Sequence, residues 1–333
     1  MLCQTPLILS ATALRSVVIC VCCIFSSLVL AQQNKPQEQT QEVPLQLLAS
    51  IKPVQLIAES LLGDLAEVEL LIPAGSSPHH FSLKPSAIRR MHAADLVLWA
   101  GADLERFLVK PVARLERPAL ALLMEDDEHV EQLAVNNTAE DEHQDHNSHS
   151  GHEHNHGHEG NPHFWMKPER VQLAAEKIVH ELERRYPKMR EQLERALADF
   201  NSRLTVADQQ LQQQLQPLQD RGFFVFHDAF AGYVEHYGLK QLGYFTVDPG
   251  RKPGAKRLGQ IRAALEQQQA VCVFVEPQFT APVVSSLTRG LDIGVGTLDP
   301  MAIETTVGRD GYMDYLQQLA DQFSACLAKN QKK

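Results

Sequence analysis

Short apolar runs alternate with amphipathic stretches along most of the chain. In the first half, apolar runs predict buried strands at 45–51, 67–75 and 95–101, and helices follow at 53–62, 82–94 and 104–113. Beyond residue 217 the alternation returns, with predicted strands at 223–227, 242–248, 271–277 and 293–299 and helices at 231–238, 255–269, 280–290 and 311–329. Strands alternating with helices of this length predict parallel sheets with helices on both faces.

A long amphipathic stretch separates the two alternating regions. Between Lys188 and Leu215 apolar residues recur at steps of three, four and seven, which places them on one face of a helix. Such a helix would span roughly 40 Å at 1.5 Å per residue. It has no Pro or Gly before residue 217, so it is a poor hinge. We interpret it as a rigid strut between two lobes, with a coiled-coil segment as the alternative.

These patterns predict an α/β protein with two lobes of mainly parallel sheet, flanked by helices and joined by one long rigid helix. A chain of this length exceeds one ordinary core, which also favours two domains. The expected division is a signal peptide at 1–31, a flexible leader at 32–44, an N-terminal lobe at 45–187, the linking helix at 188–216 and a C-terminal lobe at 217–333. A polar segment at about 126–160 interrupts the first lobe.

The first 31 residues have the features of a secretory signal peptide. Arg15 is their only charged residue, and an apolar run from Val17 to Leu30 follows it. That run is too short and too rich in cysteine for a typical membrane span. Small residues at Val29 and Ala31 suit cleavage before residue 32. We therefore expect a soluble, exported mature chain, with an uncleaved membrane anchor as the alternative.

Cleavage would leave two of the six cysteines, Cys272 and Cys326. In an oxidising compartment two cysteines most simply form one disulfide, which could stabilise the fold by about 4 kcal/mol in the chain-entropy model. A pair of buried free thiols is the alternative. A zinc site made from this pair is not expected, because two isolated thiolates would oxidise there.

The chain is acidic, with a formal net charge of −10. Loss of the single arginine in the signal segment would make the mature chain −11. Such a charge opposes binding to nucleic acid and to an anionic membrane surface, so we expect neither as a partner. It favours attraction of cations.

Seven of the sixteen residues from 143 to 158 are histidine, set among Asp, Glu, Asn, Ser and Gly. This stretch has no aliphatic side chain, so it cannot offset the entropy of ordering itself, and we expect a solvated loop. Neutral imidazole binds zinc and its neighbours, which predicts secondary metal sites of low affinity. The residues concerned are His143, His146, His149, His152, His154, His156 and His158. A polar spacer that binds metal incidentally is the alternative.

Three single histidines lie where ligands of parallel sheets bind, just beyond the carboxyl ends of strands. His79 follows the strand at 67–75, His227 closes the strand at 223–227, and His163 precedes the helix that starts near residue 168. Two belong to the first lobe and one to the second, so a cleft between lobes could bring them together. Loop histidines without a metal role are the alternative.

Three imidazoles bind Zn²⁺ well and leave a fourth tetrahedral position for water or a carboxylate. Asp299, in GTLDP, and Glu276, in VFVEP, are the carboxylates at matching strand ends.

The residues around these positions resemble a known family. The segments PAGSSPHHFSLKPS, NPHFWMKP, FFVFHDAFAGYVEHYGL and CVFVEPQF with GTLDP look like the metal-binding cluster of periplasmic solute-binding proteins, in particular the zinc-binding component of bacterial zinc-uptake ABC transporters. The resemblance covers about 45–327, including the His-rich insertion. It implies two lobes joined by a rigid helix, one Zn²⁺ in the interlobe cleft, and delivery to an inner-membrane permease with its ATPase.

The resemblance also implies roles for individual residues. It assigns His79, His163 and His227 as zinc ligands, and it pairs Cys272 with Cys326 in a disulfide. Some relatives have a glutamate just before the first histidine, where this chain has Pro78. A ligand from that position is excluded, which leaves water or Asp299 as the fourth ligand.

The remaining histidines need no metal. His92, His180 and His236 fall within predicted helices. His80 adjoins a predicted ligand, but adjacent residues rarely share one small site, so we do not assign it to the metal.

Three alternatives to zinc transport stay open at this point. A binding protein for manganese or another divalent metal is the nearest, although a third imidazole favours zinc. A zinc hydrolase comes from another class, because three histidines and a water are also a catalytic arrangement. No HExxH motif occurs, and we do not expect an enzyme. The third alternative is a metal buffer that works through the His-rich segment alone. We expect a monomer in each case.

Overall fold

The computed structural model describes residues 44–117, 119–123, 161–279 and 282–328. The predicted signal peptide, the predicted leader before residue 44 and the seven clustered histidines all lie outside these ranges. The described residues form one compact unit, to which all the elements below belong.

The first sheet has four parallel strands in the order β2-β1-β3-β4. They are β1 (Leu45–Ala49), β2 (Ala66–Leu70), β3 (Leu96–Trp99) and β4 (Leu120–Ala121). The connecting helices are α2 (Lys52–Leu62), α3 (Pro85–Ala93) and α4 (Arg106–Val112), with a 3₁₀ turn η1 at Gly63–Leu65. Every residue of β3 is buried, as expected for a parallel strand covered on both faces. The strand β4 was not predicted, because two residues are too few to show a period.

The second sheet repeats this order as β6-β5-β7-β8, again with all strands parallel. Its strands are β5 (Phe223–His227), β6 (Gln241–Thr246), β7 (Cys272–Val275) and β8 (Gly294–Thr297), and its helices are α8 (Ala231–Tyr237), α9 (Ala255–Glu266) and α10 (Pro282–Thr288). In each sheet the second strand along the chain lies on one side of the first strand, and the third strand lies on the other side. The carboxyl ends of the first and third strands mark the crevice where ligands of open sheets bind.

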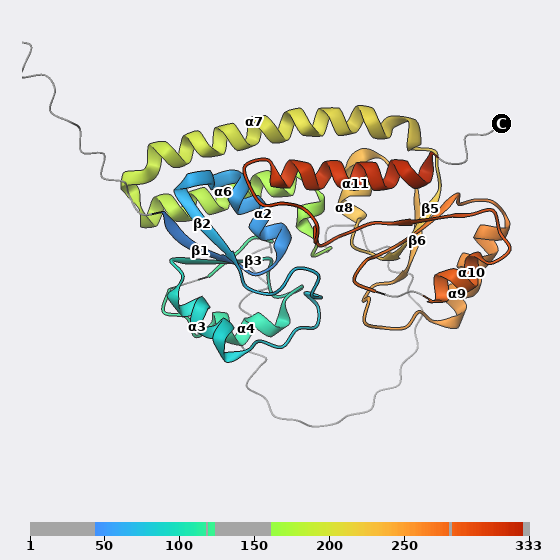
Figure 1. The fold of residues 1–333 in the computed structure, drawn as a ribbon, viewed down its shortest axis with the longest axis horizontal. Coiled ribbons are helices and arrows are strands. Elements are labelled where there is room, and N and C mark those ends of the chain that lie inside the picture. The colour runs from blue at the N-terminus through green and yellow to red at the C-terminus, as the bar shows by residue number, and fades with distance from the viewer. Residues whose placement is uncertain (1–43, 118, 124–160, 280–281, 329–333) are drawn as a thin grey trace, which may run out of the picture. The chain divides into compact units, whose positions relative to one another are not determined.

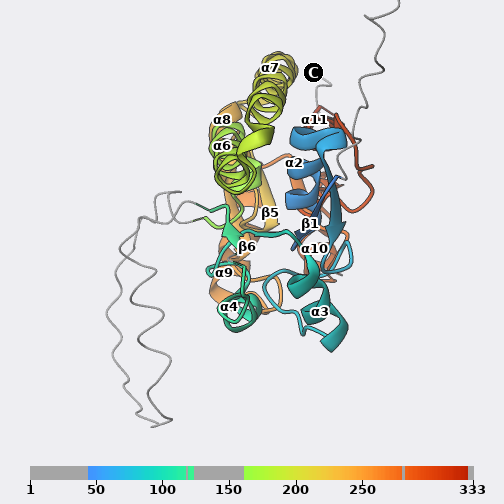
Figure 2. The ribbon, with the colours of Figure 1, turned by 90° about the vertical axis from the view of Figure 1, so that its left-hand side faces the viewer.

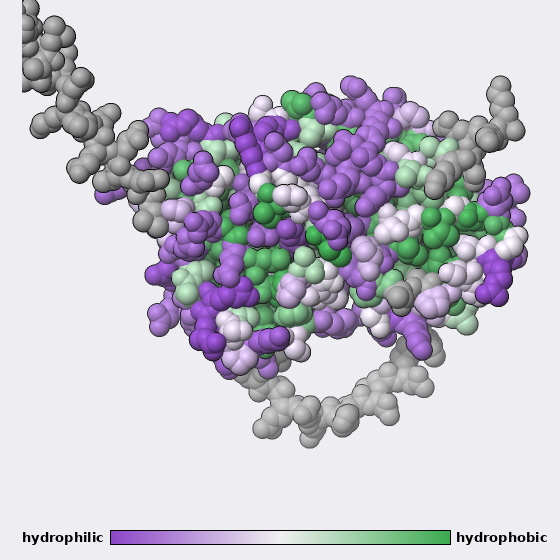
Figure 3. All heavy atoms as spheres, viewed as in Figure 1, coloured by the Kyte–Doolittle hydropathy of each residue, from purple (hydrophilic) through white to green (hydrophobic). Residues whose placement is uncertain are grey.

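Three further helices contribute to one hydrophobic cluster with strands of both sheets. They are α6 (Pro168–Arg185), α7 (Arg190–Leu215) and α11 (Gly311–Leu327), and 3₁₀ turns at Pro187–Met189 (η5) and Gln216–Leu218 (η6) flank α7. Figures 1 and 2 show α7 beside α6, and it also packs against α2, α8 and α11. Its buried residues are those of the predicted apolar face: Leu193, Phe200, Leu204, Leu211 and Leu215. Its outer side is mostly hydrophilic (Figure 3).

The predicted fold class is confirmed: two parallel sheets, flanked by helices, with a long helix between them in sequence. One continuous hydrophobic cluster runs from β1 through α6, α7 and β5 to α11. A smaller cluster lies on the other face of the second sheet, around Phe226, Phe245 and Val273. The long helix is therefore packed into the core that both sheets share. The boundaries predicted at 188 and 217 remain a prediction.

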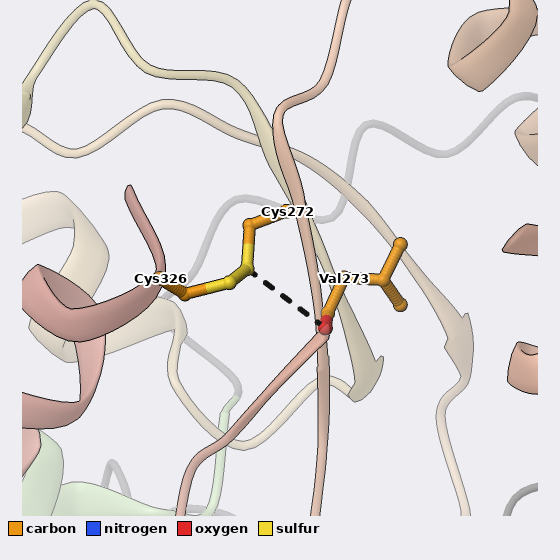
Figure 4. Close-up of a disulfide and its surroundings, with 3 residues drawn as sticks. All are labelled: Cys272, Val273 and Cys326. Carbon is orange, nitrogen blue, oxygen red and sulfur yellow. Dashed lines mark hydrogen bonds between the residues drawn. A yellow bond between two sulfur atoms is a disulfide. The ribbon is translucent and has the colours of Figure 1, made fainter. Parts of the chain in front are cut away.

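A disulfide joins Cys272, the first residue of β7, to Cys326 near the end of α11 (Figure 4). Their Cα atoms lie 6.1 Å apart, a usual spacing for such a bond. Cys272 Sγ also lies 4.0 Å from the carbonyl oxygen of Val273, a contact only, since a disulfide sulfur has no proton to donate. The helix can approach this closely because β8 has glycine at 294 and 296: an added Cβ would lie 2.9 Å from Cys326 Sγ and 2.7 Å from the Phe274 ring, respectively.

Across the described ranges, no helix combines the length and apolar composition needed to cross a bilayer.

Candidate metal centre

Three histidines from distant parts of the chain meet at one point. One ligand nitrogen from each of His79, His163 and His227 lies within 4.8 Å of the other two. Their ring centroids are 5.4 Å apart for His79 and His163, 5.6 Å for His79 and His227, and 5.0 Å for His163 and His227. In the parts of the chain that the structure describes, this is the one such group of three metal-binding side chains.

His227 is placed by the second sheet. It is the last residue of β5 and is almost fully buried. Its Nδ1 lies 2.8 Å from Oε1 of Glu276, which follows β7, the neighbouring strand. A carboxylate can only accept, so Nδ1 carries the proton and Nε2 keeps its lone pair. His227 therefore stands at the sheet's crevice with Nε2 free to bind a metal.

Asn161 orients His163 in a similar way. The Asn161 Oδ1 atom lies 2.8 Å from Nδ1 of His163 and accepts a hydrogen bond from the backbone N–H of His163 at 3.0 Å. Asn161 in turn donates from Nδ2 to the carbonyl oxygen of Asp228, 2.7 Å away. The Nε2 atoms of His163 and His227 then face each other at 3.3 Å. Two lone pairs at this distance repel unless a proton or a cation lies between them.

The third histidine lies on a loop. His79 belongs to the connection between β2 and α3, and its side chain is partly buried. Its Nε2 is nevertheless fully buried and has no hydrogen-bond partner. A buried polar atom without a partner is costly unless something else satisfies it, and a bound metal would do so.

The surroundings keep the imidazoles of His79 and His163 neutral. Burial, and then the proximity of His227, lowers the pKa of His79 to about 4. Burial, followed by His227 and His79, holds the pKa of His163 well below its usual value. Since metals bind the neutral ring, these two side chains are ready to bind a cation at neutral pH without losing a proton.

The three rings line a cavity of only about 10 Å³. Besides Glu276, its walls include mostly apolar side chains: Pro78, Pro249, Phe279, Pro300 and Met301. Such a space can hold an ion or a water-sized molecule, and it is too small for larger ligands.

The carboxylate predicted as a possible fourth ligand, Asp299, is not brought into this group. Its Oδ1 accepts hydrogen bonds from the backbone N–H of Met301 (3.0 Å) and from Gln278 Nε2 (2.8 Å), and its Oδ2 accepts one from the N–H of Ile303 (2.6 Å). Asp299 therefore caps the turn after β8. The carboxylate that borders the metal site is Glu276, and it holds a histidine ring.

The other histidines within the described ranges lie elsewhere. His80 contacts Asp248, with Nε2 3.0 Å from Oδ2. His236 links α8 to α6 and α7, through Glu169 at 2.8 Å and Asp208 at 2.6 Å. His92 and His180 lie on helices, as predicted, and both are exposed.

Sequence reasoning missed the parts played by Asn161 and Asp248. An asparagine two residues before a histidine is a local turn signal and could have been noticed. The contact between Asp248 and His80 joins residues 168 apart, and nothing in the local sequence marks it.

Buried hydrogen bonds beside the site join the segment after His163 to Pro300 and α11. Trp165 Nε1 donates to the carbonyl oxygen of Pro300 at 2.9 Å, and Tyr315 donates from its hydroxyl to the same oxygen at 3.2 Å. The Tyr312 hydroxyl donates to the carbonyl oxygen of Trp165 at 2.8 Å. The segment that carries His163 is thus tied directly to the chain between β8 and α11.

Comparisons with known proteins identify the family of this chain. The family model described as "Zinc-uptake complex component A periplasmic" (ZnuA) matches residues 47–326. The high-affinity zinc uptake system protein ZnuA of Yersinia pestis is 37% identical over 291 residues, which cover 84% of this chain and 91% of that protein. The protein of the same name from Haemophilus ducreyi is 38% identical, with 85% and 93% covered.

Solved structures show the same fold. The crystal structure of a ZnuA superposes with a TM-score of 0.66 at 26% identity, covering 85% of this chain and 99% of the other. The periplasmic zinc-binding protein TroA of Treponema pallidum has a TM-score of 0.65 at 18% identity, with 85% and 99% covered, and that likeness concerns the fold alone. Because the family model matches most of the length of the chain, the chain belongs to the ZnuA family of periplasmic zinc-uptake components.

Proposed function

We propose that this protein captures one Zn²⁺ ion with His79, His163 and His227 and delivers it to the permease of an ABC transporter for import. The observation that carries the proposal is the convergence of three imidazoles, two buried and one partly buried, with their ligand nitrogens within 4.8 Å of one another. For His163 and His227 the opposite nitrogen, Nδ1, is already engaged, which leaves Nε2 for the metal. Three imidazole nitrogens suit Zn²⁺ better than Mn²⁺, which prefers oxygen.

The fourth ligand in this proposal is a water molecule. Pro78 has no donor atom at the position where some relatives have glutamate, and the oxygens of Asp299 are occupied by two backbone N–H groups and by Gln278. Glu276 borders the cavity, but its Oε1 accepts from His227 on the side of the ring away from Nε2. A water completes a tetrahedral site and is easily displaced during transfer.

The small cavity supports transport over hydrolysis. A zinc hydrolase needs space for its substrate next to the metal-bound water. The three histidines line a space of about 10 Å³, which suits a single ion as cargo. The ZnuA relatives are named as components of high-affinity zinc uptake systems, which supports the same role and an ABC permease as partner.

Export to the periplasm forms part of the proposal. Residues 1–31 would act as a cleaved signal peptide, and the mature chain would act as a monomer. The seven histidines between residues 143 and 158 would add weaker zinc sites, because the solvated loop expected from the sequence would have to be ordered at the moment of binding.

A zinc titration of the mature chain tests the main assignment. Wild type should show one tight site, and His163→Ala should lose it, since an imidazole held by a buried hydrogen bond is removed. The matched control is His180→Ala, which removes an exposed histidine from α6. Equal affinities in wild type and His163→Ala would refute the ligand assignment.

Deletion of residues 129–160 separates transport from metal buffering. The tight site should survive, because its three ligands lie outside the deleted segment, and only weaker sites should be lost. If the tight site disappears with the deletion, the buffer hypothesis is correct and the transport site has been misassigned.

A further inference from the structure

The loop that carries His79 has little support of its own. Residues 77–83 lie outside any helix or strand, and in the described structure their backbone groups make no backbone-to-backbone hydrogen bond. The hydroxyl of Ser77 is buried and also has no partner. His163 and His227, by contrast, have rings fixed by buried hydrogen bonds. The position of His79 therefore depends on contacts that its neighbours make.

Two such contacts hold the loop from opposite sides. Phe81 packs on Phe107 of α4, beside the first sheet, with ring centroids 5.6 Å apart. His80 reaches the second sheet, where its Nε2 lies 3.1 Å from Oδ1 and 3.0 Å from Oδ2 of Asp248. In the described structure, the side chains of residues 77–83 make one polar contact, the one between His80 and Asp248. This contact is therefore the hydrogen bond that links the loop to the opposite side of the site.

Asp248 is itself held firmly. It follows β6 by two residues, and Thr246 is the buried end of that strand. The Thr246 hydroxyl donates to the carbonyl oxygen of Asp248 at 2.8 Å, and the backbone N–H of Gly250 donates to Asp248 Oδ1, also at 2.8 Å. The carboxylate thus presents a fixed acceptor to His80 at the edge of the cavity, which the next residue, Pro249, lines together with His79.

We propose that His80 and Asp248 form a clasp between the His79 loop and the second sheet, and that this clasp positions His79 and slows the release of zinc. The inference rests on the proposed function, since it concerns retention of the ion by the three histidines. His80 and Asp248 are positioning residues: the ring of His80 faces the carboxylate, and its centroid lies 6.5 Å from that of His79. Opening the clasp would free one ligand while the other two stay in place.

Zinc release kinetics test this clasp. The mature full-length chain is loaded with half an equivalent of zinc, so that the tight site fills first, and mixed with excess chromogenic chelator in a stopped-flow instrument. His80→Ala and Asp248→Ala should each raise the release rate roughly fivefold, the upper end for an ion pair with an exposed partner. The double variant should be no faster than either single variant, since both remove the same interaction.

Matched controls identify the cause of any change. His92→Ala, which removes an exposed histidine of α3, should leave the rate unchanged. His80→Gln keeps an N–H that can donate to Asp248 and should restore most of the wild-type rate. A purely structural defect would instead lower the thermal stability of the metal-free protein in His80→Ala and His80→Gln alike.

Two glycines offer an independent test that leaves both clasp residues intact. A Cβ at Gly250 would lie 3.0 Å from Cδ2 and 3.2 Å from Nε2 of His80, so Gly250→Ala should push the ring by a few tenths of an ångström and raise the release rate, by less than His80→Ala does. A Cβ at Gly254 would meet nothing within 4 Å, so Gly254→Ala should release zinc like wild type. Neither glycine has a positive φ, so the backbone conformation at both positions allows alanine.

The outcomes separate the clasp from the proposed function. If wild type binds no zinc tightly, or if His163→Ala binds it as well as wild type, the proposed function fails. If tight binding holds but His80→Ala and Asp248→Ala change the release rate less than twofold, or if their effects add, the clasp alone is wrong. X-ray absorption of the zinc-loaded His80→Ala variant should still show three imidazoles; the loss of one would make His80 a ligand and overturn the clasp.

Discussion

The Nδ1 atom of His227 lies 2.8 Å from the Oε1 atom of Glu276, and both side chains are almost fully buried. His227 is the last residue of β5, and Glu276 comes directly after β7, the adjacent parallel strand. The next strand along the chain after β5 lies on its other side, so a crevice opens between the carboxyl ends of β5 and β7. The sheet therefore places a carboxylate behind the His227 imidazole, on the side away from Nε2. Such a partner fixes the ring orientation and raises the basicity of the nitrogen that binds the metal.

Replacing Glu276 should weaken zinc binding without removing a ligand. Glu276→Ala should lower the affinity of the tight site by about 10- to 100-fold, the usual cost of losing such a partner. Glu276→Gln should lower it less, because its amide oxygen can still accept from His227 Nδ1. Competition titration with a chelator of known affinity gives the measurement. Glu304→Gln, at an exposed position, is the control, and an affinity unchanged in Glu276→Ala would show that the carboxylate does not support the site.

The metal-free protein should lose stability as the pH falls from 6.5 toward 4. The pKa of His79 is about 4 in the folded state, below its unfolded value of 6.5. Between these two pH values the unfolded chain binds a proton at His79 and the folded chain does not. Stability therefore falls with pH across this interval. At pH 5.5 this residue alone should cost about 1 kcal/mol relative to pH 7.5, and His163 shifts in the same direction.

Urea unfolding of the apo protein at pH 7.5 and 5.5 measures this effect. The difference between the two pH values should shrink in His79→Asn, which has no group that titrates in this range. If wild type and His79→Asn lose the same stability, the buried imidazole is not the cause.

Most of the fold could be predicted because its signals are local. The strand at Phe223–His227 has the predicted bounds, and the helix after His163 begins at Pro168 as expected, since proline is favoured in the first turn. The three clustered histidines could be found for a related reason: each ends or follows a strand or precedes a helix, and the ends of parallel strands meet in space.

The parts that the sequence could not decide depend on side-chain direction or on distant contacts. Asp299 and Glu276 both follow strands of the second sheet, and the sequence alone does not say which one faces the cleft. Asp299 turns to the backbone N–H groups two and four residues ahead, a local cap that competes with any ligand role. The pairing of His80 with Asp248 depends on how two loops from different sheets approach each other, which no local pattern encodes.

The disulfide should stabilise the mature protein appreciably. Cys272 and Cys326 are 54 residues apart, and closing a loop of this size contributes about 4 kcal/mol in the chain-entropy model. The chain without residues 1–31 should show no free thiols when denatured without reductant, and two after reduction. Cys272→Ala combined with Cys326→Ala should lower the free energy of unfolding in urea by a similar amount. Two thiols found without reductant would mean that the pair does not form in the exported protein.

Zinc release should involve loop movement and only a small change in the relation of the two sheets. The helix α7 contains no Pro or Gly over its 26 residues, and both α7 and α11 contribute to the hydrophobic cluster that includes strands of the two sheets. Trp165 and Pro300 are joined by a buried hydrogen bond that wide opening would break. The His79 loop has no comparable support. Removing one imidazole from zinc would already weaken binding enough for transfer to a partner.

Distance measurements and amide exchange can separate these two kinds of motion. Ser86 on α3 and Ser286 on α10 are exposed, so Ser86→Cys and Ser286→Cys introduce spin labels beside the two sheets with little disturbance. The distance between the labels should be nearly the same with and without zinc, because the shared core and the Trp165–Pro300 hydrogen bond hold the sheets together. Amide exchange should slow on zinc binding in residues 77–83 and around Asp248. A large change in the label distance, with exchange in those loops unaltered, would show that the sheets move as rigid bodies and that α7 bends.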